Sequence, residues 1–288
     1  MYKALTLRMF PNDMPTLRRL DLARDAGYDG VEVNLEPWQE YSLDTDEREL
    51  AQLRKEIEAR GLRVCTVYDR EQWHYPMSSQ DPAIRERCRT IVERLAGAAV
   101  RLGAEAVLIM PGATDNSALA PRPEIVPYAQ AYDNALGVLR ILAHTAGEKY
   151  GVHLAVENCP GKFLVSPLEF SRFVDEVGSP WVGACFDTGN AQWYGFPEHW
   201  IPVLGPRIKR VHVKDNRVAG AGEMVPTPLL AGDVNWPAVR EALSAVAYDS
   251  WITAEVFPPY RYHSERLIYD TSAAIDAIFG QGKGKGGN

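Results

Sequence analysis

Four short segments of the chain alternate aliphatic residues with other residues, and each carries an ionisable side chain at or near its end. Alternation of this kind predicts a β-strand, in which successive side chains point to opposite faces. In each segment the aliphatic residues share one face, so the ionisable side chain lies on the other face. The four ionisable residues are Glu157, Asp187, His212 and Glu255.

These four side chains meet if their strands are neighbours in one parallel sheet. Three ionised carboxylates so close together repel one another and raise the pKa of at least one of them. A divalent cation removes that repulsion. One imidazole with three carboxylates suits Mn²⁺, Mg²⁺, Co²⁺ or Zn²⁺ better than it suits a soft, thiolate-binding metal. We therefore expect a divalent metal cofactor, with Mn²⁺ as the first choice.

The elements that must position these residues alternate along the chain. Eight strand-like runs are each followed by a helix-like run, and the fourth helix is expected over residues 123–150. Eight such units predict an α/β fold, a single-domain (β/α)8 TIM barrel over residues 1–279, rather than an open doubly wound sheet with a Gly-rich phosphate turn. Residues 280–288, rich in Gly and Lys, are expected to form a flexible C-terminal tail. In such a barrel the catalytic groups come from the C-terminal ends of several strands.

The composition is that of an ordinary globular protein, with 46% hydrophobic and 24% charged residues among 288. The net charge of −7 argues against a nucleic-acid partner, which requires clustered Lys and Arg. No apolar run reaches the roughly 20 residues that a membrane helix needs. The pattern of the first residues predicts a strand and not a signal peptide. We expect a cytoplasmic protein that does not bind membranes. The four cysteines have no C-x-x-C spacing and are expected to be reduced.

Five short motifs resemble those of the xylose isomerase-like TIM-barrel superfamily of sugar isomerases and epimerases, which includes ketose 3-epimerases, hydroxypyruvate isomerase and inosose dehydratase. The motifs are Gly27–Val33, Val156–Asn158, Phe186–Gly189, His212–Asp215 and Ala254–Glu255. The resemblance implies that Glu157, Asp187, His212 and Glu255 are metal ligands. It also implies that Glu157 and Glu255 form the acid/base pair of an enzyme that isomerises or epimerises a small-molecule sugar, or a related polyhydroxy carbonyl compound, through an enediolate.

Further residues expected near the C-terminal ends of the barrel strands are candidate substrate contacts. Relatives often have histidine three residues after the aspartate, where this chain has Asn190; an amide can hydrogen-bond a hydroxyl but cannot transfer a proton. Lys214 and Arg217 can bind substrate hydroxyls or an anionic group. Aromatic and imidazole rings after the third strand can cover a sugar ring as a lid. The full set of candidate contacts is Glu32, Trp73, His74, Asn190, Lys214 and Arg217.

Three other functions are compatible with the same barrel. The first is a dehydratase or lyase that acts on a keto-inositol or a glycoside with the same site. The second is a phosphodiesterase of the endonuclease IV type, disfavoured because its multinuclear zinc cluster needs several more histidines than the six in this chain. The third is a non-catalytic sugar-binding barrel without a divalent metal. Barrels of this kind often form homo-oligomers, but no residue pattern defines an interface.

Overall fold

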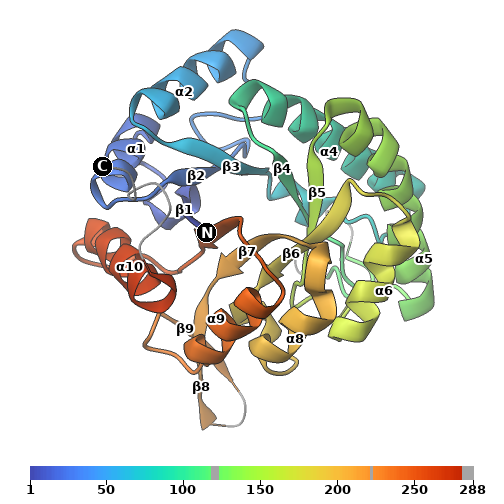
Figure 1. The fold of residues 1–288 in the computed structure, drawn as a ribbon. Coiled ribbons are helices and arrows are strands. Elements are labelled where there is room, and N and C mark those ends of the chain that lie inside the picture. Colours follow the sequence, from blue (N-terminus) through green and yellow to red (C-terminus); the bar gives the residue numbers. More distant parts are fainter. Residues whose placement is uncertain (118–122, 221–222, 281–288) are drawn as a thin grey trace.

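The computed structural model of the chain describes residues 1–117, 123–220 and 223–280. Eight parallel strands close into a barrel in the order β1-β10-β7-β6-β5-β4-β3-β2, with helices around them (Figure 1). The predicted α/β fold, a single TIM-barrel domain, is confirmed. The barrel strands are β1 (Tyr2–Thr6), β2 (Gly30–Asn34), β3 (Arg63–Tyr68), β4 (Ala106–Ile109), β5 (His153–Glu157), β6 (Val182–Asp187), β7 (Ile208–Val213) and β10 (Trp251–Ala254).

The helices lie outside the barrel, and their ends follow ordinary capping chemistry. The carboxylate of Asp46 accepts hydrogen bonds from two backbone N–H groups at the start of α2, and Gly103 ends α4 in the left-handed conformation. The α-helices are α1 (Thr16–Asp25), α2 (Glu47–Ala59), α3 (Glu71–His74), α4 (Pro82–Leu102), α5 (Tyr128–Leu142), α6 (Pro167–Val177), α7 (Thr188–Ala191), α8 (Pro197–Leu204), α9 (Trp236–Ala245) and α10 (Ser264–Phe279). Shorter turns are η1 (Leu7–Met9), the π-helical η2 (Ala143–Glu148) and η3 (Gly205–Arg207).

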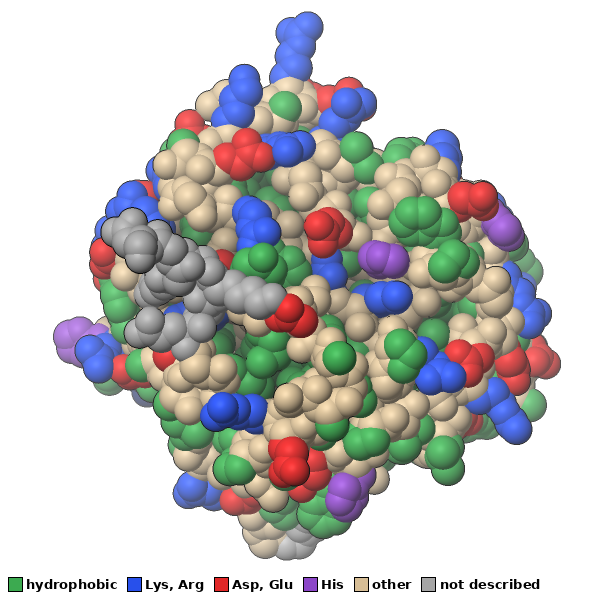
Figure 2. All heavy atoms as spheres, viewed as in Figure 1, with side chains coloured by type: hydrophobic (Ala, Val, Ile, Leu, Met, Phe, Trp, Pro, Cys, Tyr) green, Lys and Arg blue, Asp and Glu red, His purple; other side chains and the backbone are tan. Residues whose placement is uncertain are grey.

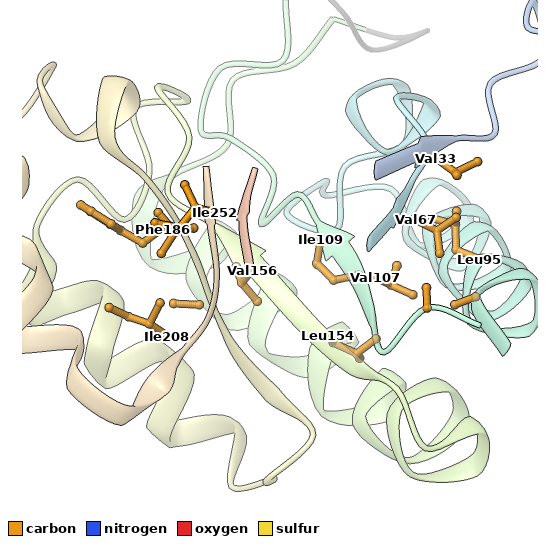
Figure 3. Close-up of a cluster of buried hydrophobic side chains, with 14 of the residues drawn as sticks. Val33, Val67, Leu95, Val107, Ile109, Leu154, Val156, Phe186, Ile208 and Ile252 are labelled. Carbon is orange, nitrogen blue, oxygen red and sulfur yellow. The ribbon is translucent and has the colours of Figure 1, made fainter. Parts of the chain in front are cut away.

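The alternation of the strands separates two buried layers. Aliphatic side chains on the outer face pack against the helices; Val67 and Val107, for example, lie near Leu95 of α4 (Figure 3). The inner face carries a different set, which includes Tyr68, Cys185 and the ionisable side chains. The aliphatic side chains of β5, β6 and β10 were predicted to share one face of each strand. They do so, and this face packs toward the helices.

Two features differ from the sequence prediction. The fourth helix, expected over residues 123–150, begins only at Tyr128, because the segment before it pairs with the loop after β4: Val126 N–H donates to the Thr114 carbonyl at 2.8 Å. The second is an antiparallel hairpin after β7, formed by β8 (Asp215–Val218) and β9 (Met224–Thr227), which was not predicted. It projects from one side of the barrel (Figure 1).

The rest of the described chain agrees with the expectations about surface and thiols. Acidic and basic side chains are interspersed on the face seen in Figure 2. All four cysteines are buried and unpaired, as expected for reduced thiols. No helix in the described part of the chain combines the length and apolar character needed to cross a bilayer. Residues 281–288 of the expected tail lie outside the described residues.

The layer between barrel and helices should carry much of the stability. Phe173 of α6 is fully buried, with its ring edge-on to Tyr132 at 5.2 Å between centroids. We expect Phe173→Ala to lower the free energy of unfolding by about 3–5 kcal/mol, because it removes apolar contacts and leaves a cavity. Urea unfolding followed by circular dichroism measures this loss. The matched control is Leu168→Ala on the same helix, where the side chain is 71% exposed and a change within about 0.5 kcal/mol is expected.

Candidate metal centre

Four consecutive barrel strands bring the predicted ligands together. Glu157 and Asp187 are the last residues of β5 and β6, His212 lies near the end of β7, and Glu255 directly follows β10. One nitrogen or oxygen atom from each of the four lies within 4.8 Å of the others, and all four side chains are buried. The convergence expected from strand phase is therefore present at the carboxyl ends of neighbouring strands.

The imidazole of His212 is fixed from one side. Its Nε2 lies 3.1 Å from Oε2 of Glu32, which belongs to β2 across the barrel. Its Nδ1 faces the other carboxylates, at 3.6 Å from Glu157 Oε1 and 3.7 Å from Glu255 Oε2. An imidazole held by a carboxylate at one nitrogen presents the other nitrogen as a ligand, the usual arrangement at metal sites.

Asp187 is held by its backbone and by one of its two oxygens. The amide of Asn158 bonds both the N–H and the C=O of Asp187, at 2.7 and 3.0 Å. Oδ1 accepts the N–H of Asn190 at 2.7 Å, whereas the buried Oδ2 accepts no hydrogen bond. Burial, with added repulsion from the neighbouring glutamates, raises the pKa of Asp187 to about 7. One carboxyl with a raised pKa is what the sequence analysis expected for this cluster.

The two glutamates stand in different environments. Glu255 lies between two cations: its Oε1 is 3.4 Å from Arg8 Nη1, and its Oε2 is 2.6 Å from Lys214 Nζ. Burial alone would raise the pKa of Glu255, but Lys214 and the other positive neighbours hold it well below its usual range. Glu157 instead accepts from neutral groups, the amide of Asn190 at 3.3 Å and the thiol of Cys159 at 3.4 Å.

The donor set fits a divalent cation. Three of its buried atoms, Asp187 Oδ2, His212 Nδ1 and Glu255 Oε2, make no hydrogen bond in the described structure. Leaving a buried polar atom without a hydrogen bond costs about 1–3 kcal/mol. The two oxygens instead face the Lys214 ammonium, at 3.1 and 2.6 Å, which shows that this position attracts a cation. A cation that accepts oxygen and imidazole ligands satisfies all of them, together with a carboxylate oxygen of Glu157.

The other sequence-predicted residues fall at different distances from this centre. Asn190 and Lys214 contact the ligand carboxylates directly, and Glu32 contacts His212 from behind. Trp73, on the short helix α3, packs against the cluster inside the barrel that includes Met110 and Cys159, with His74 next to it in the chain. Arg217 is exposed on β8, and its guanidinium donates to the backbone carbonyl of Ala231.

Sequence reasoning missed Arg8 although the signal was available. The alternation of Leu5 and Leu7 with Thr6 and Arg8 resembles that of the other strands, and it suggests an inward Arg8. In the structure, β1 ends at Thr6 and Arg8 lies in the turn η1. The guanidinium of Arg8 lies 5.1 Å from the Phe257 ring centroid and close to Tyr68 on another side. The position of this group, between aromatic rings and next to Glu255, depends on residues far apart in the chain.

Comparison with known proteins agrees with the geometry. Residues 20–277 match the family model described as xylose isomerase-like TIM barrel. The uncharacterized protein MJ1311 of Methanocaldococcus jannaschii is 29% identical over 195 residues, covering 63% of this chain and 62% of that protein. The putative L-ribulose-5-phosphate 3-epimerase SgbU of Escherichia coli is 24% identical over 251 residues, or 82% of each chain.

Solved structures share the fold at lower sequence identity. D-psicose 3-epimerase, crystallised in the presence of D-fructose, superposes with a TM-score of 0.77 at 18% identity over 97% of this chain and 100% of its own. The IolI protein with a bound zinc atom superposes with a TM-score of 0.79 at 17% identity, over 96% of this chain and 98% of its own. Both likenesses extend over the complete barrel.

Asp69, directly after β3, makes stability depend on pH. Its Oδ1 accepts the N–H of Glu71 at 2.8 Å, its Oδ2 has no hydrogen-bond partner, and burial raises its pKa from 3.8 to about 7. At pH values between 3.8 and about 7, the Asp69 carboxyl is therefore protonated to a greater extent in the folded state than in the unfolded state. The stability contributed by the protonated carboxyl is lost as pH rises from about 4 to about 7. Asp69→Asn cannot ionise and should escape this loss.

We expect Asp69→Asn to gain on the order of 2 kcal/mol of unfolding free energy relative to the wild type between pH 4.5 and pH 8. Urea unfolding of both proteins at these two pH values measures the difference. A gap between the variant and the wild type that stays constant with pH would show that Asp69 does not titrate in this range.

Proposed function

The chain belongs to the xylose isomerase-like TIM-barrel family, and from this we propose that it is a divalent-metal-dependent isomerase or epimerase of a sugar or related polyhydroxy carbonyl compound. The observation that carries the proposal is the pair of carboxylates on either side of His212. Glu157 and Glu255 come from different strands, and each approaches Nδ1 of His212 within 3.7 Å. Two carboxylates at one buried donor site can bind a cation and also move protons.

We assign the cation to Glu157, Asp187, His212 and Glu255, whose donor atoms converge and include three without hydrogen bonds. A bound divalent ion supplies Lewis acidity, which stabilises negative charge on a carbonyl oxygen and a neighbouring hydroxyl of the substrate. Mn²⁺ remains our first choice from the ligand types. Zn²⁺ is the main competitor, because the IolI protein of the same fold is described with a bound zinc atom.

The unlike surroundings of the two glutamates divide their roles. The carboxylate of Glu157 accepts hydrogen bonds from a neutral amide and a thiol rather than from Arg or Lys, so we assign to Glu157 the removal of the proton from the carbon next to the carbonyl. Glu255 is ionised at rest, so it passes on a proton taken from water or from the adjacent Lys214 ammonium, to the opposite face of that carbon in epimerisation or to the adjacent carbon in isomerisation. Groups placed in this way typically contribute about 10²- to 10⁴-fold to the rate.

We assign the substrate contacts to the other polar and aromatic side chains around Glu157 and Glu255. Asn190, which touches Glu157, can hold a hydroxyl but cannot carry a proton, so the proton transfers stay with the two glutamates. Lys214 and Glu32 offer a cation and an anion beside the ligands. We assign Trp73, with His74 next to it in the chain, to one wall of the substrate site, and Arg217, which donates to the Ala231 carbonyl, to its outer edge. A ketose fits best, because the E. coli relative is named a putative L-ribulose-5-phosphate 3-epimerase and the solved D-psicose enzyme is a 3-epimerase.

A dehydratase or lyase acting on a keto-inositol or glycoside is the second candidate. The amide of Asn190, at 3.3 Å from Glu157 Oε1, stands where relatives often carry a histidine that contacts the substrate. A change at this position can alter which bond breaks after the first proton is removed. The two outcomes share the proton abstraction by Glu157 and differ in whether water or an alcohol leaves.

Proton exchange with solvent tests the proposed reaction. Metal-loaded protein in D₂O is incubated with a panel of ketoses, aldoses and inososes, and carbon-bound deuterium is followed by NMR. We expect deuterium at the carbon next to the carbonyl without loss of water. Loss of water would favour the dehydratase, and the absence of both changes on every substrate would contradict proton transfer at this site.

The same assay tests the role of Glu157. Glu157→Gln keeps an oxygen ligand but cannot accept the proton, so we expect exchange to fall by at least about 10²-fold while metal binding largely persists. The control is Glu169→Gln on α6, whose carboxylate accepts from Tyr128 at the outer surface. Exchange at the wild-type rate in Glu157→Gln would reject Glu157 as the base.

Metal binding can be measured without a substrate. We expect the wild type to bind one equivalent of Mn²⁺ by calorimetry and to melt at a higher temperature when loaded, because the ion binds the folded state only. A chelator should reverse this gain. Asp187→Asn should weaken binding by about tenfold or more, since it removes a charged ligand, whereas Asp133→Asn on the exposed face of α5 should bind like the wild type. Equal affinity in Asp187→Asn would exclude this residue as a ligand.

A further inference from the structure

The ammonium group of Lys214 lies among the proposed metal ligands. Its Nζ lies 2.6 Å from Glu255 Oε2 and 3.1 Å from Asp187 Oδ2. Apart from this ammonium, neither oxygen has a hydrogen-bond partner in the described structure, and both suit a cation. An ammonium group and a divalent metal ion cannot both lie against the same pair of oxygens, because the two cations repel each other strongly at such short range.

The main chain and the stem of Lys214 are held firmly, so that only its outer part is free to move. The hydroxyl of Thr188 accepts the N–H of Lys214 at 3.0 Å and donates to its C=O at 2.8 Å. The inner methylene groups pack on Gly189, where an added Cβ would come within 2.7 Å of Lys214 Cγ. The side chain as a whole is 20% exposed, so it is not completely enclosed by the protein.

We propose that Lys214 is the resident counter-cation of the metal site and that a divalent metal ion must displace its ammonium to bind. Without metal, Lys214 neutralises Asp187 and Glu255 and keeps the buried carboxylates from repelling one another. When the metal takes these oxygens, the ammonium moves outward while its stem stays against Gly189. This inference rests on the proposed metal site but not on the reaction assigned to it.

Replacing the Lys214 ammonium by a metal ion costs free energy, and a variant without the ammonium avoids this cost. In the wild type, the free energy of metal binding is reduced by that of breaking two ion pairs with Lys214. Lys214→Met has no ammonium to displace, so its carboxylates are free to bind the metal but repel one another in its absence. The variant should therefore bind the metal more tightly and be less stable than the wild type when metal-free.

Calorimetric titration of the metal-free proteins with Mn²⁺, at one pH and one ionic strength, tests the proposal. We expect Lys214→Met to bind Mn²⁺ about tenfold or more tightly than the wild type and, metal-free, to melt lower by on the order of 5 °C. Lys214→Arg keeps the charge and should stay within about threefold of the wild-type affinity. Lys55→Met, on the exposed face of α2, controls for loss of a lysine elsewhere.

The outcomes separate this inference from the proposed function. Unchanged or weaker Mn²⁺ binding in Lys214→Met, with normal binding by the wild type, would overturn the displacement of Lys214 and leave the metal site intact. No binding by either protein would overturn the metal site itself. If Lys214→Met does not fold without metal, Lys214→Gln replaces it in the same titration, and the same tightening is expected because it also lacks the charge.

Discussion

The structure depends on the compensation of negative charge inside the mouth of the barrel. Glu157, Asp187 and Glu255 are all buried there around His212. Carboxylates in such a place stay ionised only beside positive charge, since burial and mutual repulsion both favour the neutral acid. The pKa of Asp187 is raised because its burial outweighs the one ammonium of Lys214, whereas the pKa of Glu255 is lowered because both Lys214 and Arg8 contact it.

The barrel supplies this arrangement through its parallel strands, which all end at the same rim. Each ligand then depends on a partner from a different strand or loop: His212 on Glu32, the backbone of Asp187 on Asn158, and Glu157 on Asn190. These contacts fix where the donor atoms point, which matters because metal binding and proton transfer both lose efficiency when groups are misplaced by about an ångström. The barrel fold therefore supplies the position of the four side chains, while their individual partners orient them.

The unequal environments of the two glutamates connect stability with function. The carboxylate of Glu255 lies between two cations, Arg8 and Lys214, whereas that of Glu157 accepts hydrogen bonds from an amide and a thiol. If a metal ion displaces the Lys214 ammonium, the negative charge of Glu255 is compensated by the divalent cation instead of by the ammonium. The same cluster is then compatible with a folded metal-free protein and with a loaded catalyst.

The sequence by itself determined the barrel and the convergence of Glu157, Asp187, His212 and Glu255 at its mouth, because alternation is a local property. The residues before Glu157 or Asp187 show which way each side chain points. Local patterns misjudged the start of α5, where pairing between loops replaces helix, and did not predict the hairpin β8–β9. Only the tertiary structure decided which atoms meet. Arg8 and Glu255 are 247 positions apart, and the place of the Lys214 ammonium depends on Thr188 and Gly189, because long side chains find their partners only once the barrel has closed.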